Sequence, residues 1–366
     1  MEQSDQDHAA LNQKLADLRE QMKLGGGQKR IEAQHAKGKR TARERVAAFL
    51  DEGSFQEING LMTNRHVEFG MDKDKALGDG MVAGFGTVNG RKVAIFAQDF
   101  TVMGGSYGEV AGQKVAKIMD LAISAGVPVI GMNDGGGARI QEGIYSLAAF
   151  GELFYRNVQA SGVIPQISVM LGPSAGGAVY SPAMTDFIVM TQGQSNMFIT
   201  GPEVIKTVTG EEIDAETLGG AITHSSISGV AHFVGANEDD TLNTVKKLLD
   251  YIPDNNTEAP KRIASNDSPL RADKSLDTVV PVDPNETYNI LDVINHVVDT
   301  GSFFEVMAAY AQNAVIGFAR LNGEVVGVVA NQPAVMAGVL DINASDKIAR
   351  FVRFCDAYNI PLVTFV

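Results

Sequence analysis

The sequence predicts an α/β protein in which one structural unit occurs twice. From Met81 onward, strand-like and helix-like segments alternate along the chain, which is the pattern of layered α/β folds. The pair Asn89-Gly90 separates two strand-like runs, and Asn-Gly in that position is a strong hairpin signal. Residues 81–133 also match residues 314–366 without gaps, at an offset of 233 positions. Together these observations predict a duplicated α/β domain.

Composition and charge narrow the possible functions. The chain has 366 residues, which suits two domains better than one, and 45% of them are apolar. Its formal net charge of −14 argues against nucleic acid as the main partner, although a local basic patch could still hold a small anion. The single cysteine, Cys355, can form neither an internal disulfide nor a metal site of the usual cysteine spacing.

No segment of the sequence predicts a membrane association. The longest mostly apolar stretch falls far short of the roughly 20 residues that span a bilayer. The N-terminus has no apolar signal core. We therefore expect a soluble cytoplasmic protein without membrane insertion.

The N-terminal segment is expected to be helical. Apolar residues recur at helical spacing over residues 8–24, and three consecutive glycines follow them. A second helix is expected from about Thr41 to Leu50. A basic cluster lies between the two helices and is unusual in so acidic a chain; it consists of Lys37, Lys39 and Arg40. This cluster is either a solvated loop or a contact for a phosphate-bearing ligand.

The repeated unit and its continuation give the expected element order. Strands are expected over 81–87, 92–97, 127–130 and 167–171, and helices over 109–125, over 144–161 and after Gly176. Residues 253–284 are rich in Pro, Asn, Asp and Ser and are expected to form an interdomain linker. The expected organisation is an N-terminal helical segment 1–45, a first domain 46–252, the linker 253–284 and a second domain 285–366.

Two glycine-rich segments are the best candidates for chemistry. Gly172–Ala178 follows an apolar strand and opens a helix, where unpaired N–H groups carry partial positive charge. Such a segment could hold an oxyanion, for example the enolate of a thioester, but its glycines could equally serve close helix–strand packing. Gly135–Gly143 lacks the spacing of a dinucleotide-binding motif or a P-loop. Within it, Arg139 and Glu142 are three residues apart and are expected to pair with each other.

The sequence contains no clear motif for catalysis by side chains. The six histidines are scattered and none has the i, i+4 spacing of a metal site. No GxSxG motif surrounds Ser174 or Ser181. The acidic run from Glu211 to Glu216 is typical of a solvated loop or helix start. These absences agree with a mechanism that depends on backbone amides.

At the glycine-rich segments the sequence resembles a known family. The matching segments are Phe96–Ser106, Gly136–Gly143, Ala160–Ser168, Gly172–Pro182, Met197–Pro202, Gly317–Arg320, Asn331–Pro333 and Arg350–Asp356. They resemble the carboxyltransferase (β) subunits of biotin-dependent propionyl- and acetyl-CoA carboxylases, and they are also similar to the α subunit of methylmalonyl-CoA decarboxylases. The resemblance runs from about Lys37 to Val366.

This resemblance implies a fold and a reaction. The fold is a tandem of crotonase-like (ClpP/crotonase) domains, the second of them incomplete in this chain. The reaction moves a carboxyl group from carboxybiotin to the α-carbon of propionyl-CoA or acetyl-CoA. Biotin is the implied cofactor, carried by a separate biotin carboxylase or carrier subunit, and no bound metal is implied. The implied assembly is a homo-oligomer, commonly a hexamer, in which the C-terminal domain of a neighbour holds the carboxybiotin.

The resemblance also implies roles for individual residues. The catalytic backbone amides fall on Gly176 and Gly177. The acyl-CoA contacts fall on Gly136, Gly137, Ala138, Ala178, Phe198, Gly201 and Pro202. Possible contacts to the CoA phosphates are Lys37, Lys39 and Arg40, and possible biotin-side residues are Asn331, Gln332 and Gly338. The family's second oxyanion hole falls beyond Val366, so we expect this chain to lack it.

Three alternative functions stay open. The first is the soluble α subunit of a sodium-pumping methylmalonyl-CoA decarboxylase, which runs carboxyl transfer in reverse. The second is a non-catalytic subunit or fragment that only binds acyl-CoA. The third is a crotonase-type hydratase or isomerase, which would need an acid/base carboxylate beside Gly177, and the sequence places none there convincingly.

Overall fold

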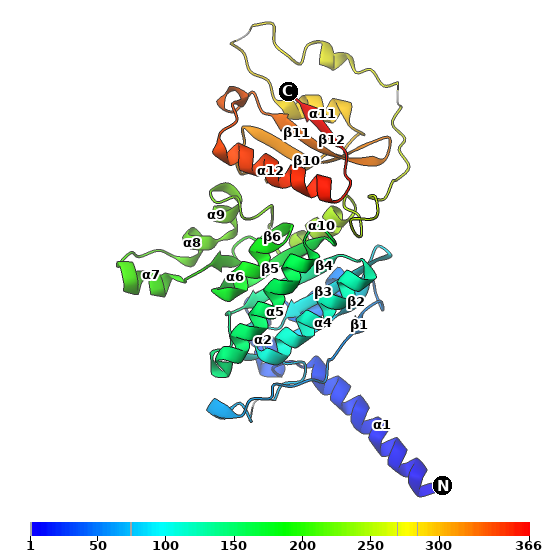
Figure 1. Ribbon diagram of the computed structural model, residues 1–366, viewed down its shortest axis with the longest axis vertical. Coiled ribbons are helices and arrows are strands. Elements are labelled where there is room, and N and C mark those ends of the chain that lie inside the picture. The colour runs from blue at the N-terminus through cyan, green and yellow to red at the C-terminus, as the bar shows by residue number, and fades with distance from the viewer. Residues whose placement is uncertain (1, 74, 269, 284) are drawn as a thin grey trace.

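The computed structural model describes residues 2–73, 75–268, 270–283 and 285–366. Figure 1 shows a body built on two sheets, with α1 projecting from one end and the second sheet lying at the other. The helices are α1 (Glu2–Lys23), α2 (Gln28–His35), α3 (Ala42–Phe49), α4 (Glu109–Ala125), α5 (Ile144–Ala160), α6 (Gly177–Met184), α7 (Pro202–Thr209), α8 (Ala215–Gly219), α9 (Ala221–Ser226), α10 (Glu238–Leu249), α11 (Ile290–Val297) and α12 (Ile342–Ala357). The strands are β1 (Gln56–Glu57), β2 (Met81–Val88), β3 (Arg91–Gln98), β4 (Val129–Gly135), β5 (Gln166–Ala175), β6 (Phe187–Thr191), β7 (Asn196–Phe198), β8 (Phe233–Gly235), β9 (Phe304–Val306), β10 (Ala314–Leu321), β11 (Glu324–Asn331) and β12 (Leu362–Phe365).

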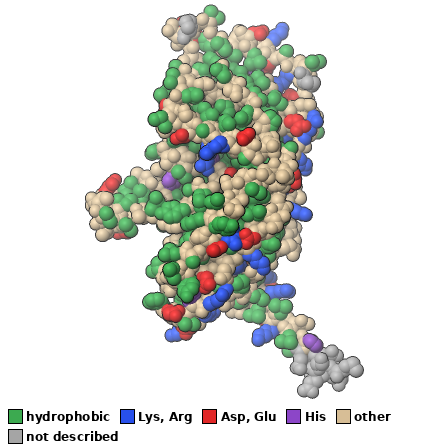
Figure 2. All heavy atoms as spheres, in the orientation of Figure 1, with side chains coloured by type: hydrophobic (Ala, Val, Ile, Leu, Met, Phe, Trp, Pro, Cys, Tyr) green, Lys and Arg blue, Asp and Glu red, His purple; other side chains and the backbone are tan. Residues whose placement is uncertain are grey.

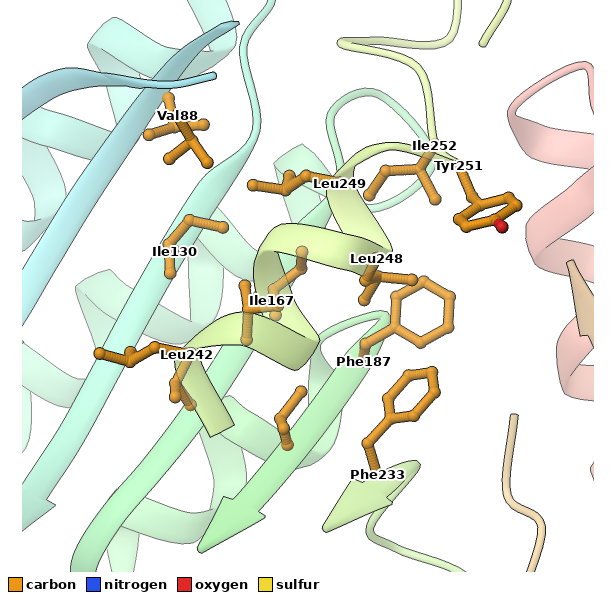
Figure 3. Packing of buried hydrophobic residues seen from close by; sticks show 14 of the residues in the cluster. Val88, Ile130, Ile167, Phe187, Phe233, Leu242, Leu248, Leu249, Tyr251 and Ile252 are labelled. Atoms are coloured by element: carbon orange, nitrogen blue, oxygen red, sulfur yellow. The ribbon is translucent and has the colours of Figure 1, made fainter. Parts of the chain in front are cut away.

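The first sheet has the strand order β1-β2-β3-β4-β5-β6-β8, and β7 pairs with β5. β2 and β3 form an antiparallel hairpin, whereas β3, β4, β5, β6 and β8 run parallel to one another. Helices α4 and α5 pack on one face of this sheet, and α3 and α10 pack on the other. Figure 3 shows Ile130, Ile167 and Leu242 pointing toward one another between the sheet and α10. Burial on both faces explains why these strands are almost continuously apolar.

The second sheet has the order β12-β11-β10-β9. β10 and β11 form an antiparallel hairpin, and β12 runs parallel to β11. Helix α11 packs on one face. Helix α12 packs on the other, where its core continues into that of the first sheet. The stretch 253–284 between the sheets has no regular helix or strand among its described residues except a short 3-10 turn at Lys274–Asp277.

The duplication predicted from the sequence is confirmed. β10, β11 and α12 each begin 233 residues after β2, β3 and α4. The hairpin turn is also repeated, because Asn89 and Asn322 both have a φ of 52°. The glycines that follow them have φ of 77° and 79°, as a type I′ turn requires.

The repeat begins earlier in the chain than the sequence comparison indicates. α11 begins 248 residues after α3, and Asp299 lies 248 residues after Asp51. Both aspartates accept hydrogen bonds from their hairpin turn: Asp51 from the amides of Asn89 and Gly90 at 2.9 and 2.8 Å, and Asp299 from the equivalent amides at 2.9 and 2.7 Å. The offset changes because the first copy has a longer connection between β1 and β2, so an ungapped comparison cannot follow the repeat.

Each copy buries one lysine at the same position of its long helix. The Lys114 ammonium donates to the Met81 carbonyl at the start of β2. The Lys347 ammonium donates to the Ala314 carbonyl at the start of β10, at 2.7 Å. Burial lowers the pKa of both lysines to about 8. These contacts tie each hairpin to its helix, which is a structural role.

Most local predictions are confirmed, with differences at the N-terminus. The expected helices 109–125 and 144–161 are α4 and α5, and the helix near Thr41 is α3. The sequence pattern does not predict α2, because Ile31 is its only large apolar residue. Helix α1 also begins earlier than the pattern suggests, at Glu2. No helix within the described ranges is long and apolar enough to cross a bilayer.

Candidate functional site

The two glycine-rich segments lie side by side at the carboxyl ends of β4 and β5. These strands are parallel neighbours, and Gly135 pairs with Ser174. A Cβ atom on Gly137 would lie 2.8 Å from the Ala175 carbonyl oxygen, and the φ of Gly137 is +94°. Glycine is therefore required here for both the close approach and the backbone conformation. The carboxyl edge of a parallel sheet is also where ligands bind in open α/β folds.

At the start of α6, the backbone amides of the expected catalytic residues differ in their hydrogen bonding. The amide of Gly176 donates to the carbonyl oxygens of Phe198 and Ile199, at 3.2 and 3.1 Å. The Gly176 N–H therefore already has partners within the chain in this structure, and a catalytic role for its amide stays a prediction. Gly176 also makes the turn, with φ 59° and ψ −130°. The amides of Gly177 and Ala178 open the helix and have no hydrogen-bond acceptor in the described part of the chain.

A second segment forms a wall beside this helix start. β7 pairs with the end of β5, which places Phe198 opposite Ala175. Gly201 precedes α7, Pro202 lies in the first turn of that helix, and a Cβ on Gly201 would meet the Phe198 ring at 3.3 Å. The structure thus brings Phe198, Gly201 and Pro202 together near the start of α6, as the resemblance implies.

The predicted pair between Arg139 and Glu142 is confirmed, at 2.9 Å, and it belongs to a larger buried network. The fully buried Arg139 guanidinium also donates to the Asp79 carboxylate at 2.5 Å and to the Ser106 carbonyl at 3.0 Å. The Arg139 amide donates to the Tyr107 carbonyl at 3.0 Å. Because these partners come from two other segments, the network holds the glycine-rich segment after β4 in place. Sequence reasoning misses Asp79, which has no motif around it.

The basic cluster does not form one surface. Lys39 donates to the buried carboxylate of Asp134 at 2.9 Å. Arg40 forms two hydrogen bonds to Asp239, at 2.7 and 3.0 Å. Only Lys37 is exposed without a carboxylate partner among the described residues, and its ammonium lies 5.6 Å from the centre of the Phe100 ring. Of the three cations, Lys37 is therefore the one available to an external anion.

A cavity lies beside Lys37. It has a volume of about 320 Å³ and is lined by Lys37, Phe100 and Gly104, among other residues. The carbonyl of Gly104 accepts the amide of Gly136 at 3.1 Å. The cavity thus ends next to the segment that follows β4, and one extended ligand could reach from Lys37 to that segment.

The three biotin-side candidates lie at the end of β11 and in the segment that follows it, and their polar groups form hydrogen bonds within the chain. Asn331 donates to the Gly338 carbonyl at 2.7 Å, and Gln332 donates to Asn289 at 2.7 Å while accepting the Ile290 amide. The first copy has the equivalent of the Asn331 contact between Gln98 and the Gly105 carbonyl. These contacts explain the three residues structurally, and a role toward biotin stays a prediction.

The comparisons with known proteins identify a family for this chain. The family model of the carboxyl transferase domain matches residues 33–366. The propionyl-CoA carboxylase carboxyltransferase subunit of Haloferax mediterranei is 56% identical over 352 residues, which cover 96% of this chain and 68% of that protein. The methylmalonyl-CoA decarboxylase subunit alpha of Veillonella parvula is 54% identical over 356 residues, which cover 97% of this chain and 69% of that protein.

A solved structure extends the likeness to three dimensions. The transcarboxylase 12S structure, described as a hexamer assembly with methylmalonyl-CoA bound, has a TM-score of 0.96 and 50% identity. The match covers 98% of this chain and 70% of that one, so the α/β fold with its crotonase-like arrangement is shared. Because the family model and close relatives match from the basic cluster through the second sheet, the chain belongs to the carboxyl transferase domain family.

Proposed function

We propose that this chain is the carboxyltransferase component of a biotin-dependent acyl-CoA carboxylase. The observation that carries the proposal is the pair of free amides on Gly177 and Ala178, beside the glycine-rich segment after β4. Residues 46–252 would form the acyl-CoA domain, residues 253–284 the linker and residues 285–366 the part of the biotin domain in this chain. The relatives named as propionyl-CoA carboxylase subunits support a short acyl-CoA as the substrate.

The site residues act through main-chain groups. The thioester carbonyl oxygen of acyl-CoA accepts hydrogen bonds from the amides of Gly177 and Ala178. When the α-proton leaves, the charge of the enolate collects on this oxygen, and each amide stabilises it by about 3 kcal/mol. Carboxybiotin, carried by its own subunit, would supply the CO2 that the enolate carbon attacks, and the biotin anion left after loss of that CO2 would accept the α-proton. The Phe150 ring lies 3.4 Å from the Cβ position of Gly177 and keeps that side of the site apolar.

The same geometry argues against a hydratase or isomerase. Such an enzyme needs a carboxylate next to the oxyanion amides to move protons. The three nearest atoms to the Cβ position of Gly177 all belong to the Phe150 ring. The decarboxylase alternative remains a second candidate, because the Veillonella parvula subunit is 54% identical to this chain. The two reactions use the same carboxyl-transfer site in opposite directions.

The proposal includes partners. A biotin carrier subunit must deliver the carboxyl group, and further copies of this chain would complete the assembly, as in the hexameric transcarboxylase relative. Exposed apolar side chains on α5, including Ile144, Leu147 and Val158, support a contact with another copy. A cytoplasmic location stays an expectation of the sequence.

The test of the proposal is carboxyl transfer in the holoenzyme. With carboxylated biotin carrier and propionyl-CoA or acetyl-CoA, we expect labelled carboxyl to appear on the acyl-CoA. In the reverse direction, we expect loss of CO2 from a carboxylated acyl-CoA to depend on added biotin. Acyl-CoA binding without any biotin-dependent transfer would instead support the non-catalytic alternative.

Removal of the Lys37 charge is expected to weaken acyl-CoA binding in a salt-dependent way. We expect Lys37→Gln to raise the dissociation constant of acyl-CoA about fivefold at low salt, and by less at high salt, because exposed charges are screened. The control Arg40→Gln should have little effect, since Arg40 is paired with Asp239. Titration calorimetry with acyl-CoA and with acyl-pantetheine, which lacks the nucleotide phosphates, separates the contribution of the phosphates to binding from that of the acyl-pantetheine part. An equal effect on both ligands would show that Lys37 does not contact a phosphate.

A further inference from the structure

The carboxyl end of α6 is held by an arginine from the second copy of the repeat. Arg350 lies on α12, and its guanidinium donates to the Thr185 carbonyl at 2.8 Å and to the Asp186 carbonyl at 3.5 Å. Helix α6 ends at Met184, so these carbonyls directly follow its last turn. Carbonyl groups at a helix end lack intrahelical partners and carry partial negative charge, which a cation stabilises.

Helix α6 is short, and it depends on contacts at both ends. It has eight residues, and Pro182 lies inside it. So short a helix is marginal by itself, because few of its hydrogen bonds can form. Its first turn carries the amides of Gly177 and Ala178, while its last turn meets Arg350. A shift of the last turn would therefore move or tilt the amides at the first.

The helix that carries Arg350 is packed firmly against the first sheet. The Phe354 ring of α12 meets the Phe187 ring edge-on, with centres 4.7 Å apart. The Met307 amide, just after β9, donates to the His232 carbonyl, just before β8, at 3.0 Å. This hydrogen bond joins the second sheet to the first. Figure 3 shows Phe187, Phe233 and Tyr251 on the side of the first sheet that faces this helix. Figure 2 shows basic side chains gathered just below α12, where the two parts of the molecule meet.

Among the described residues, Arg350 is the only charged side chain that donates to the Thr185 and Asp186 carbonyls. Burial raises the pKa of Asp186 to about 7, while a hydrogen bond from the Gln166 amide and the charge of Arg350 lower it. The Lys347 ammonium is occupied by carbonyls at the start of β10. Arg350 and Arg353, which lies one turn further along α12, both line a cavity between α12 and the first sheet, but Arg353 makes no hydrogen bond or ion pair within the described part of the chain.

The contact is not a general property of the repeated unit. Lys117 occupies the position of Arg350 in the first copy, 233 residues earlier. Its ammonium is exposed and donates to the Asn59 side chain at 3.3 Å. The first copy thus needs no arginine there, and the contact between Arg350 and α6 is specific to the junction between the two copies.

We propose that Arg350 is a positioning residue for carboxyl transfer: it fixes the carboxyl end of α6 and thereby the direction of the Gly177 and Ala178 amides. The second copy of the repeat thus holds part of the acyl-CoA site of the first copy within one chain. The inference rests on the function proposed above for these amides. Small displacements of groups that stabilise a transition state are costly, since an error of about 1 Å can reduce the rate about a hundredfold.

The test compares three variants in the holoenzyme. Arg350→Met removes both hydrogen bonds but keeps an apolar stem, Arg350→Lys keeps the charge, and Arg353→Met removes an unbonded arginine from the same helix and cavity. We expect Arg350→Met to lower kcat by about tenfold to a hundredfold, with KM for acyl-CoA changed by less than about threefold. Arg350→Lys should recover part of the loss, and Arg353→Met should resemble the wild type.

Several results would overturn the inference. A wild-type kcat in Arg350→Met, with only a lower Tm, would assign Arg350 a purely structural role. Equal losses of kcat in Arg350→Met and Arg353→Met would show that charge in the cavity, rather than the contact with α6, is responsible. If Arg350→Met does not fold, Arg350→Gln takes its place, and a wild-type kcat in that variant would overturn the inference. Full activity in Gly177→Val would instead refute the proposed function of the amides, whatever Arg350 does.

Discussion

Gly177→Val is expected to remove most of the carboxyltransferase activity while the protein stays folded. The Cβ position of Gly177 is 3.4 Å from the Phe150 ring, which is an ordinary contact, and Gly177 does not have a positive φ. A Cβ alone can therefore be accommodated there. The two methyl groups of valine extend beyond that Cβ toward the Phe150 ring, so the ring or the helix start that carries the amides must shift to make room for them. We expect kcat/KM to fall by about a hundredfold to a thousandfold, as for loss of an oxyanion donor.

A second glycine provides the matched control. Gly151 lies inside α5, and a Cβ built on it meets nothing within 4 Å. Gly151→Val thus places the same branched side chain in a helix away from the Gly177 amides, and we expect activity near that of the wild type. The oligomeric state of this variant is measured as well, because α5 carries the proposed contact with another copy. Circular dichroism and steady-state kinetics on both variants separate folding from chemistry. Unchanged kinetics in Gly177→Val would refute the assignment of the oxyanion amides to the start of α6.

Asp134→Ala is expected to cost the largest amount of stability. Asp134 is fully buried and accepts hydrogen bonds from Arg45 at 2.7 Å, from Lys39 at 2.9 Å and from Gln34 at 3.2 Å. Without the carboxylate, Lys39 and Arg45 would remain as buried cations, and only Arg45 would keep an acidic partner, Glu238. Removal of one partner from a buried ion pair typically lowers the free energy of unfolding by about 3 to 5 kcal/mol.

The control for this prediction is another aspartate–arginine pair of the same chain. Asp239 pairs with Arg40, but its side chain is 66% exposed. Exposed ion pairs contribute about 0 to 1 kcal/mol, so Asp239→Ala should change the free energy of unfolding little. Urea denaturation of both variants measures the difference. Similar small losses in the two variants would show that the buried network does not stabilise the fold.

The Asp134 network also explains why residue 172, in the glycine-rich segment Gly172–Ala178, is a glycine. A Cβ on Gly172 would lie 1.8 Å from the Asp134 carboxylate and 2.7 Å from the Lys39 ammonium. Gly172 is therefore required to make room for the ion pairs. For this residue the packing interpretation is correct, whereas the amide of Gly177, two residues beyond the end of β5, has no acceptor among the described residues. One glycine-rich motif thus contains both kinds of glycine.

Local features of this protein could be predicted from the sequence because they depend on neighbouring residues. The Asn-Gly turns, the boundaries of α4 and α5 and the offset between the two copies follow from turn preferences and from apolar periodicity. The two glycine-rich segments could also be located, since each follows an apolar strand. What these patterns cannot show is which backbone groups remain free once the chain has folded.

Contacts between distant segments were decided only by the tertiary structure. The Gly176 amide is occupied because β7 brings the Phe198 and Ile199 carbonyls against it. Lys39 is occupied because β4 places Asp134 beside it, some ninety positions later in the chain. Arg350 reaches the end of α6 only because α12 packs across the junction between the two sheets. A hydrogen bond depends on the distance between two groups in space, and the packing of the whole chain, rather than the pattern around either residue, sets that distance.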